Sequence, residues 1–397
     1  MDTILSILNQ SLREAIAPST AAVVIAVIGL NIHFGFTGLL NMGQAGFMLI
    51  GAYGFAISII EGLPLVVAIV VGLGGALLFA LVLGIPTLKL RGDYLAIVTI
   101  SAAEIVRFVG RLSALEDFTG GALGLRGSRY QGPFLDLSFL PDTSWTLSPF
   151  NYRDTFDGSG VVRGLAGLLF IGLVVAAVLL VRRFRGAPAA TSGARWGRVG
   201  AVVGLSLLAL LAIFFVFPIT YQNNVAQGWW VRLVAWTLVG LCTLLAALLV
   251  RSPWGRLLRG IREDEDAIRS LGKNVFAIKM QALIIGGSFG ALGGIVYVLP
   301  STVQADSMGR ALTFFAYTAL LIGGAATIFG PVLGTVIFYG GRVLLRETAN
   351  AYVPSSIMSD QQTETFSLIV VGVVLMLLVI FRPQGILGDK RELRINV

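Results

Sequence analysis

The sequence predicts an all-α fold, a polytopic transmembrane helical bundle of about eleven spans, and three observations support this prediction. Of the 397 residues, 56% are hydrophobic and only 13% are charged, whereas a soluble globular protein carries about 25% charged residues. Apolar stretches of the length needed to cross a bilayer recur along the whole chain. Basic residues concentrate in alternate loops, so the net charge of +8 is explained by the positive-inside rule rather than by nucleic acid binding.

The elements follow in order from the N-terminus. Residues 1–17 mix apolar and charged side chains and predict an amphipathic segment at the membrane surface that ends near Pro18. The transmembrane domain then covers residues 18–381, and 382–397 form a tail. The predicted spans, some of which could be broken or half helices, are 18–36, 42–60, 63–83, 94–112, 161–181, 199–218, 229–250, 277–299, 310–328, 331–346 and 365–381. Residues 310–328 and 331–346 are separated by Gly330 and Pro331 and could form one hairpin or one broken helix.

The charges of the loops orient these spans. The loop 182–198 holds five arginines and no acid, and the loop 251–276 holds six basic residues. The segment 113–160 instead has six acids and three arginines. Placing the basic loops in the cytoplasm gives strict alternation through all eleven spans. We therefore expect an external N-terminus, an external loop 113–160, a cytoplasmic loop 251–276 and a cytoplasmic tail.

The composition also excludes several kinds of site. One cysteine excludes a disulfide framework, and one histidine excludes a multi-histidine metal site. A metal or proton-relay role for His33 is disfavoured because the sequence places no carboxylate beside it. The phosphate-binding pattern G-x-x-x-x-G-K-[ST] does not occur, so we expect no ATPase domain in this chain. We predict no metal, no cofactor and no enzymatic activity.

Residues 31–51 interrupt an apolar run with amides, a hydroxyl and glycines. The polar side chains Thr37, Asn41 and Gln44 lie among four glycines, and buried amides need hydrogen-bond partners. A discontinuous helix that faces a polar translocation path would supply such partners. A plain cytoplasmic turn between two spans explains the same residues equally well.

The predicted span 94–112 holds Glu104 and Arg107 in its interior and Arg111 close to its outer boundary. Glu104 and Arg107 are three positions apart, on one helix face, and can neutralise one another. Charged groups inside spans are candidates for function, so this pair either faces the translocation path or is structural. In another span, Gly286, Gly290 and Gly294 form a stripe typical of close helix packing.

The loop 251–276 has apolar residues at helical intervals among its charges. This pattern predicts short amphipathic helices that dock on a partner, although a solvated loop is the alternative. Apolar residues, Leu258 among them, would bury against the partner, charges would set the orientation, and Gly272 would cap a helix C-terminus. The candidate docking residues are Leu257, Arg259, Ile261, Arg262, Glu263, Glu265, Ile268, Leu271 and Gly272.

This loop resembles the coupling loop of permeases in the branched-chain amino-acid ABC importer family, whose pattern is R-S-P-x-G-R-x-L-x-A-I-R-E-N-E-x-A-A-x-x-L-G-x-N. Four more segments are similar to motifs of that family, in the same order: 37–47, 90–107, 119–125 and 323–334. Gln44 stands where the family often has histidine, and Ala326 stands for a glycine. Residues 161–218 resemble an additional hairpin.

The resemblance implies a permease subunit in the bacterial cell membrane that imports branched-chain amino acids. It further implies a second homologous permease, two ATP-binding cassette ATPase subunits and an extracytoplasmic substrate-binding protein as partners. Urea or short amides are alternative substrates within this class. An ion-coupled secondary transporter, with Glu104 as coupling carboxylate, is a second alternative. A membrane enzyme acting on lipid through the acids at 263–266 is the least favoured.

Overall fold

The computed structural model describes residues 2–88, 92–147, 168–169, 172–173, 175–176, 219–223, 228–353, 360–382 and 384–388. Its contacts divide the chain into two units, one of residues 1–9 with 142–224 and a larger one of residues 10–141 with 225–397. The predicted spans 161–181 and 199–218 lie almost entirely outside the described residues, and the loop 182–198 does so completely.

The nine other predicted spans each coincide with helix in the described residues, which confirms the all-α polytopic fold. The main helices are α1 (Asp2–Ala15), α2 (Pro18–Leu30), the π-helix η1 (Asn31–Phe36), α3 (Gln44–Ile60), α4 (Leu65–Thr87), α5 (Gly92–Arg111), α11 (Trp229–Arg251), α12 (Pro253–Glu263), α13 (Glu265–Ser270), α14 (Val275–Val298), α15 (Arg310–Gly323), α16 (Gly330–Tyr352) and α17 (Asp360–Phe381). Four continuous stretches among them are long and apolar enough to cross a membrane: Pro18–Phe36, Leu65–Thr87, Trp229–Arg251 and Val275–Val298.

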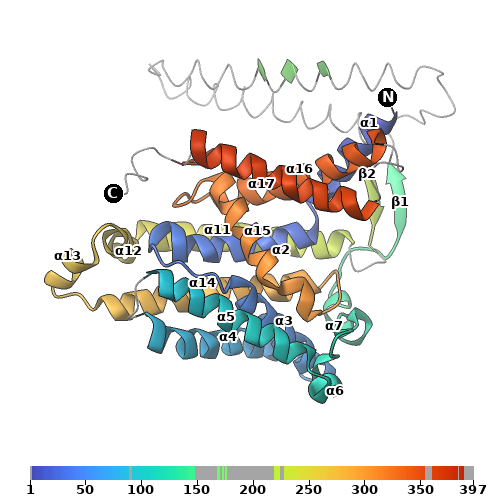
Figure 1. Ribbon diagram of the computed structural model, residues 1–397. Helices are drawn as coiled ribbons and strands as arrows, with labels where there is room; N and C mark the ends of the chain where they lie inside the picture. Colours follow the sequence, from blue (N-terminus) through green and yellow to red (C-terminus); the bar gives the residue numbers. More distant parts are fainter. Residues whose placement is uncertain are drawn as a thin grey trace, which may run out of the picture. The chain divides into compact units, whose positions relative to one another are not determined.

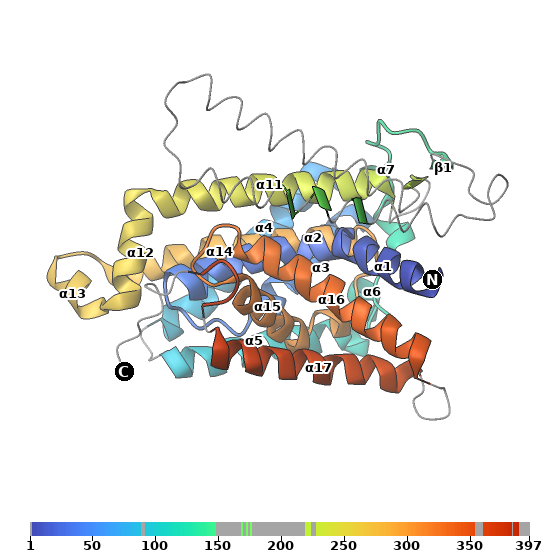
Figure 2. The ribbon, with the colours of Figure 1, turned by 90° about the horizontal axis from the view of Figure 1, so that it is seen from above.

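Helix α14 lies at the centre of the bundle, packed against α2, α3 and α4, and α11 packs on α2 (Figure 1 and Figure 2). The predicted glycine stripe of α14 permits its contacts. A Cβ atom at Gly294 would lie 1.9 Å from the carbonyl oxygen of Met48, and one at Gly286 would lie 2.2 Å from His33 Nε2. Close packing by small residues, which substitutes in lipid for hydrophobic driving force, is therefore confirmed at this stripe.

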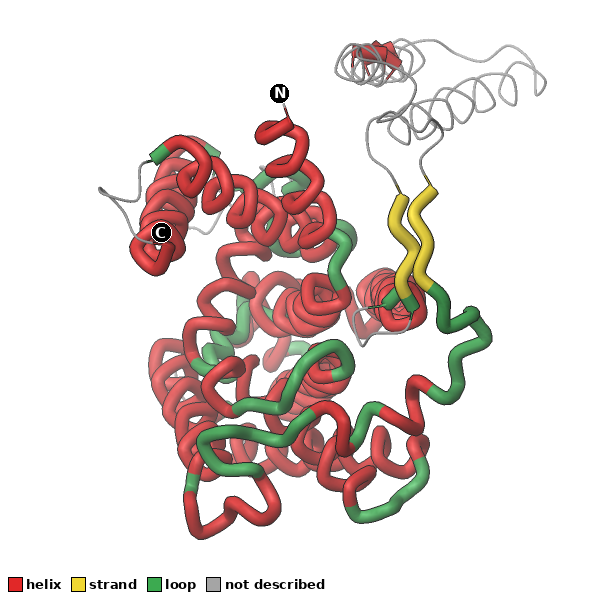
Figure 3. The backbone as a smooth tube through the Cα atoms, turned by 90° about the vertical axis from the view of Figure 1, so that its right-hand side faces the viewer, coloured by secondary structure: helices red, strands yellow, loops and turns green. Residues whose placement is uncertain are grey.

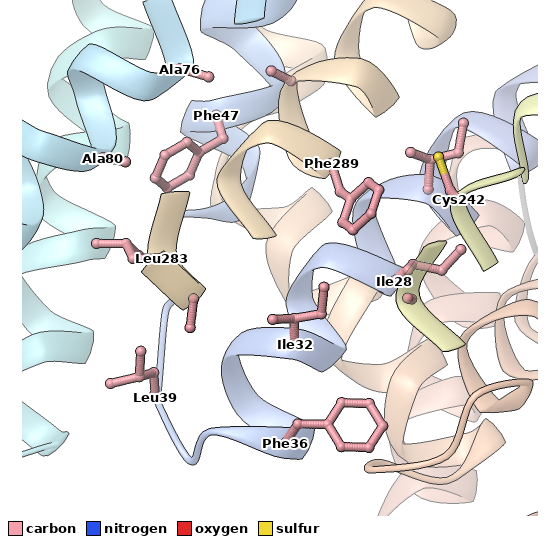
Figure 4. Packing of buried hydrophobic residues seen from close by; sticks show 14 of the residues in the cluster. Ile28, Ile32, Phe36, Leu39, Phe47, Ala76, Ala80, Cys242, Leu283 and Phe289 are labelled. Atoms are coloured by element: carbon pink, nitrogen blue, oxygen red, sulfur yellow. The ribbon is translucent and has the colours of Figure 1, made fainter. Parts of the chain in front are cut away.

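Helix α4 packs through a second row of small residues. Ala68, Ala76 and Ala80 are buried at spacings of four or eight, whereas the other side of α4 exposes valines and leucines. The ring of Phe47 lies among Ala76, Ala80 and Leu283 in Figure 4. On the same helix the ring of Phe79 meets that of Phe47 edge-on at 4.8 Å between centroids, so two small alanines and one aromatic ring of α4 seat Phe47 of α3.

The segments around Gly330 form a hairpin, which decides between the two predicted arrangements. Helix α15 ends at Gly323 rather than at residue 328, and α16 runs from Gly330 to Tyr352 rather than to 346. A Cβ atom at Gly334 would lie 1.9 Å from the carbonyl oxygen of Ala319, and the rings of Phe315 and Phe338 lie 5.6 Å apart. This pairing of residues is that of two antiparallel helices.

The loop predicted to be external begins with short helical turns: η2 (Ser113–Leu115), α6 (Glu116–Thr119), η3 (Gly127–Arg129) and α7 (Gly132–Leu135). Tyr130 is fully buried there, and its hydroxyl donates to the carbonyl oxygen of Ser301 2.7 Å away, just beyond α14. Burial also raises the pKa of Tyr130. Figure 3 views the bundle from the end that carries α6 and α7, and Figures 1 and 2 place α12 and α13 at the opposite end.

In the smaller unit, β1 (Ser144–Leu147) pairs antiparallel with β2 (Ile219–Gln222), with Ser144 opposite Gln222. The two ends of the segment 148–218 therefore meet. Charge parity places residues 144–147 and 219–222 on the same side of the membrane, as this pairing requires.

Candidate functional site

The predicted helix break lies deep inside the bundle. The amide of Gln44, at the start of α3, donates to the carbonyl oxygen of Ala26 3.0 Å away, and its nitrogen also lies 3.2 Å from the carbonyl oxygen of Gly286. Ala26 precedes the end of η1 at Phe36 by roughly 15 Å at the helical rise of 1.5 Å per residue. Residues 37–43 therefore return from the end of η1 to the middle of α2, so they are not a plain turn at the membrane surface.

Side-chain amides satisfy one another within this break. Asn41 Nδ2 donates to His33 Nδ1 at 3.0 Å, and the other ring nitrogen of His33 donates to the carbonyl oxygen of Leu283 at 3.2 Å. This pattern assigns His33 as a neutral ring with its proton on Nε2. Asn41 Oδ1 accepts from the backbone amide of Gly43 at 2.9 Å. A helix break in an apolar environment persists only when its polar groups find such partners.

Hydroxyl groups from two other helices hold the backbone of the break. Thr99 on α5 accepts from the amide of Met42 at 3.0 Å, and Thr313 on α15 accepts from the amide of Ala45 at 3.0 Å. The hydroxyl of Tyr317, also on α15, donates to the carbonyl oxygen of Asn41 at 3.0 Å. The break therefore lies between α5 and α15. No role was predicted from the sequence for these three residues, although Thr99 lies in the family-like segment 90–107.

The three polar residues predicted from the sequence are brought together here but are buried within the chain. Thr37, Asn41 and Gln44 are at most 2% exposed, and Thr37 donates to the carbonyl oxygen of Ile32 at 2.8 Å. The neighbouring side chains of Leu40 and Met42 are only partly buried. The amides thus hold the break, and its apolar side chains are the ones that reach the surface of this chain.

Glu104 and Arg107 form an ion pair that extends to a segment distant in sequence. Two guanidinium nitrogens of Arg107 donate to one oxygen of Glu104 at 2.8 and 2.9 Å, and the third donates to Asp306 at 2.5 Å. Asp306 lies in η4 (Ala305–Met308) and also accepts from Arg111 at 3.2 Å. The other oxygen of Glu104 accepts from the backbone amide of Arg310, at the start of α15. The predicted pair therefore joins α5 to η4 and α15.

A second interruption, between α15 and α16, contacts the first. Asn31 in η1 donates to the carbonyl oxygen of Thr327 at 2.8 Å and accepts from the amide of Ala326 at 2.9 Å. Ala326 has φ of 60°, a left-handed conformation that glycine adopts without steric cost. This conformation gives a physical reason for the glycine that the resembled family pattern has at this position.

Part of the predicted tail packs on the same interruption. The amide of Ile386 donates to the carbonyl oxygen of Ile322 at 2.9 Å, and that of Leu387 donates to the carbonyl oxygen of Gly323 at 3.0 Å. These carbonyl groups end α15 and would otherwise lack helical partners. Residues 384–388 are therefore a folded cap on α15 rather than a free tail.

The predicted coupling loop 251–276 contains short helices, as its pattern indicated, and these are α12 and α13. Asp264 caps α13 by accepting from the amide of Ala267 at 2.9 Å, and Asn274 caps α14 by accepting from Ala277 at 3.0 Å. Gly272, the glycine predicted to cap a helix C-terminus, follows just after α13 and has φ of 74°.

The structure corrects the predicted role of the apolar side chains in this loop. Leu258 and Ile261 are 0% and 5% exposed, in one core cluster with Phe36 and Leu39. Leu257 and Ile268 are partly buried against the same cluster. The apolar face of α12 thus packs on its own chain, and these residues are not free to bury in a partner. Leu271, at 72% exposed, is the accessible exception.

The charged candidates of the loop have different environments. Arg262 donates to the carbonyl oxygen of Gly35 in η1 at 2.5 Å, and the guanidinium carbon of Arg259 lies 5.8 Å from the ring centroid of Phe36. Glu265 pairs with Arg269 in α13 and with Lys279 in α14, whereas Glu263 is exposed. Among the described residues, no group of three or more His, Cys, Asp or Glu side chains is arranged to hold a metal ion.

Residues 12–379 match the family described as the permease component of the branched-chain amino acid transport system. Over 378 residues the chain is 29% identical to the high-affinity branched-chain amino acid transport system permease protein LivM of Escherichia coli K12, covering 95% of this chain and 70% of that protein. It is 24% identical to the probable branched-chain amino acid transport permease protein LivM of Methanocaldococcus jannaschii, over 48% of this chain and 54% of that one. No solved structure is a significant match.

A permease named for a different substrate is also similar to part of the chain. The guanosine ABC transporter permease protein NupQ of Bacillus subtilis is 33% identical over 98 residues, which are 23% of this chain and 29% of that protein.

Proposed function

Because the chain belongs to the family of permease components of branched-chain amino acid transport systems, we propose that it is one of two permease subunits in an ATP-driven importer of branched-chain amino acids. The family match over residues 12–379 is the observation that carries this proposal. Two separate ATPase subunits supply the energy, an external binding protein delivers the substrate, and this chain catalyses no covalent reaction.

The translocation path runs along the face where the helix break lies between α5 and α15. Three features support this placement. Polar backbone at membrane depth is tolerated where it is buried in protein or lines a cavity, and Leu40 and Met42 bring this break to the surface of the chain. The pair Glu104–Arg107 lies on α5, one to two turns beyond Thr99. Ionised groups are costly against lipid, so this face meets protein or water.

Within this path, Thr37, Asn41 and Gln44 act by holding the break in place. Transport by the double variant Asn41→Leu with Gln44→Leu tests this role. We expect uptake to be lost in protein that still inserts and still retains its ATPase partner. Full uptake by a well-expressed double variant would show that these residues have no role in the translocation path.

The docking surface for the ATPase is the exposed side of α13 with Leu271 and Glu263. It lies at the end of the bundle opposite α6 and α7, on the side that charge parity assigns to the cytoplasm. Leu271 is its one strongly exposed apolar side chain, and a buried anchor of this kind contributes about 1–3 kcal/mol to an interface.

The variant Leu271→Asp should weaken co-purification of the ATPase and reduce ATP-dependent uptake. Leu123→Asp is a matched control, because Leu123 is 81% exposed but lies in the external loop, and it should leave co-purification unchanged. Equal co-purification by both variants would refute this docking surface.

Two further measurements test the transport mechanism and the substrate. Uptake by the intact complex in vesicles that hold ATP but no ion gradient separates ATP-driven import from the ion-coupled alternative. Competition of leucine, urea or guanosine with the transported substrate tests the substrate class.

A further inference from the structure

The coupling loop contacts the helix break directly through one arginine. Arg262, in the last turn of α12, donates to the carbonyl oxygen of Gly35 at 2.5 Å. Gly35 is in the final turn of η1, where backbone carbonyl groups lack helical partners and a cation is electrostatically favoured. Arg262 also lies against Gly38, where a Cβ atom would be 3.2 Å from its Cγ. One side chain therefore contacts the residues at which the break begins.

Helix α12, which carries Arg262, is held in place by contacts with neighbouring helices. The indole of Trp254 donates to Gln281 Oε1 at 3.0 Å, and Glu265 pairs with Lys279, so both short helices are tied to α14. Leu258 and Ile261 are buried in the core. A force applied to the exposed side of α13 would therefore displace α12 as a unit, and Arg262 would move with it.

The chain that Arg262 contacts has features of a hinge. η1 is a π-helix, a form often found at functional sites. Gly38 has φ of 75°, a conformation that favours glycine. A Cβ atom at Gly35 would lie 2.0 Å from Asn31 Oδ1 and 2.6 Å from the amide of Ala326. Gly35 therefore has no room for a side chain, and the hydrogen bond from Arg262 acts directly on its backbone carbonyl.

We propose that Arg262 is a positioning residue that transmits displacement of α12 to the helix break at residues 37–43. This inference rests on the proposed function, since the displacing force comes from the ATPase. Arg262 would not itself dock on the ATPase or touch the substrate. It would instead link the movement of the docking surface to the start of the break, and through Asn31 to the turn that holds Ala326.

The test measures substrate taken up per ATP hydrolysed by the complete transporter in proteoliposomes. Arg262→Gln should keep ATPase co-purification and ATP hydrolysis but lower this ratio by about tenfold, the size expected when one hydrogen bond from a charged group is lost. Arg262→Lys keeps a cationic donor and should recover most of the ratio. Arg256→Gln, an exposed arginine of the same helix, is the matched control and should keep the wild-type ratio.

Several outcomes would overturn the inference. An unchanged ratio in Arg262→Gln would show that the contact transmits nothing. Loss of ATPase co-purification or of thermal stability, with the ratio intact in the remaining complexes, would make Arg262 a docking or structural residue instead. A wild-type chain that neither retains an ATPase nor couples uptake to ATP would refute the proposed function itself, so the two failures are distinguishable.

Discussion

Replacing Asn41 by leucine should destabilise the protein more than any other single loss of an amide in the break. Asn41 Oδ1 is the hydrogen-bond acceptor for the buried amide of Gly43, and Asn41 Nδ2 is the donor to His33 Nδ1. Leucine has a similar volume but can supply neither contact. An unpaired buried backbone amide costs about 1–3 kcal/mol, and a side-chain hydrogen bond between membrane helices contributes roughly 0.6–1.7 kcal/mol. The expected loss is therefore about 2–4 kcal/mol.

The assay is reversible unfolding of the purified protein in mixed micelles by increasing denaturing detergent. Thr37→Val is the matched control, since it removes one hydroxyl bond, to the carbonyl oxygen of Ile32, and leaves no backbone amide unpaired. We expect it to cost less than about 1 kcal/mol. If Asn41→Leu unfolded within about 0.5 kcal/mol of wild type, or if Thr37→Val cost as much, the argument that amides hold this break would be wrong.

Three further predictions test other parts of the structure. In a background with Cys242 replaced by alanine, a cysteine at Ser270 should react with an impermeant thiol reagent only after the cytoplasmic side is opened; labelling of intact cells would refute the topology. At Ala326, glycine should be tolerated whereas valine should lower thermal stability clearly, because a β-branched residue rarely adopts the left-handed φ of 60° found there; equal stability of both variants would contradict this. Gly124→Ala should disrupt the contact with Val303, since its Cβ atom would lie 2.1 Å from that carbonyl oxygen, and proteolysis of the external loop should then accelerate.

The sequence predicted what depends on local chemistry. Apolar runs predicted the helices, because a helix that crosses a bilayer needs about twenty predominantly apolar residues. The stripe through Gly290 predicted close packing, and the position of Gly272 after an amphipathic run predicted a helix cap. Each of these features is determined by residues near one another in the chain, so a local pattern suffices to identify it.

The features that were missed depend on contacts between distant residues. Periodicity predicted that Leu258 and Ile261 would be buried, but it does not identify what buries them, and the answer was the chain's own core. Asp306 joins the pair at Arg107 from 199 positions away. The depth of the break follows from the bond between Gln44 and Ala26, and no property of either residue alone predicts it.

The hydrogen bonds of the break favour a two-state element over a loosely flexible one. His33 and Gln44 have partners on α2 and α14, Asn41 donates to His33, and Thr99 and Thr313 fix the adjacent backbone from α5 and α15. In an apolar environment a partial displacement would leave several of these groups unpaired at once, each at a cost of about 1–3 kcal/mol. The break can therefore move only by exchanging its partners together. In the proposed mechanism, displacement of the Arg262 contact at the start of the break would bias such an exchange.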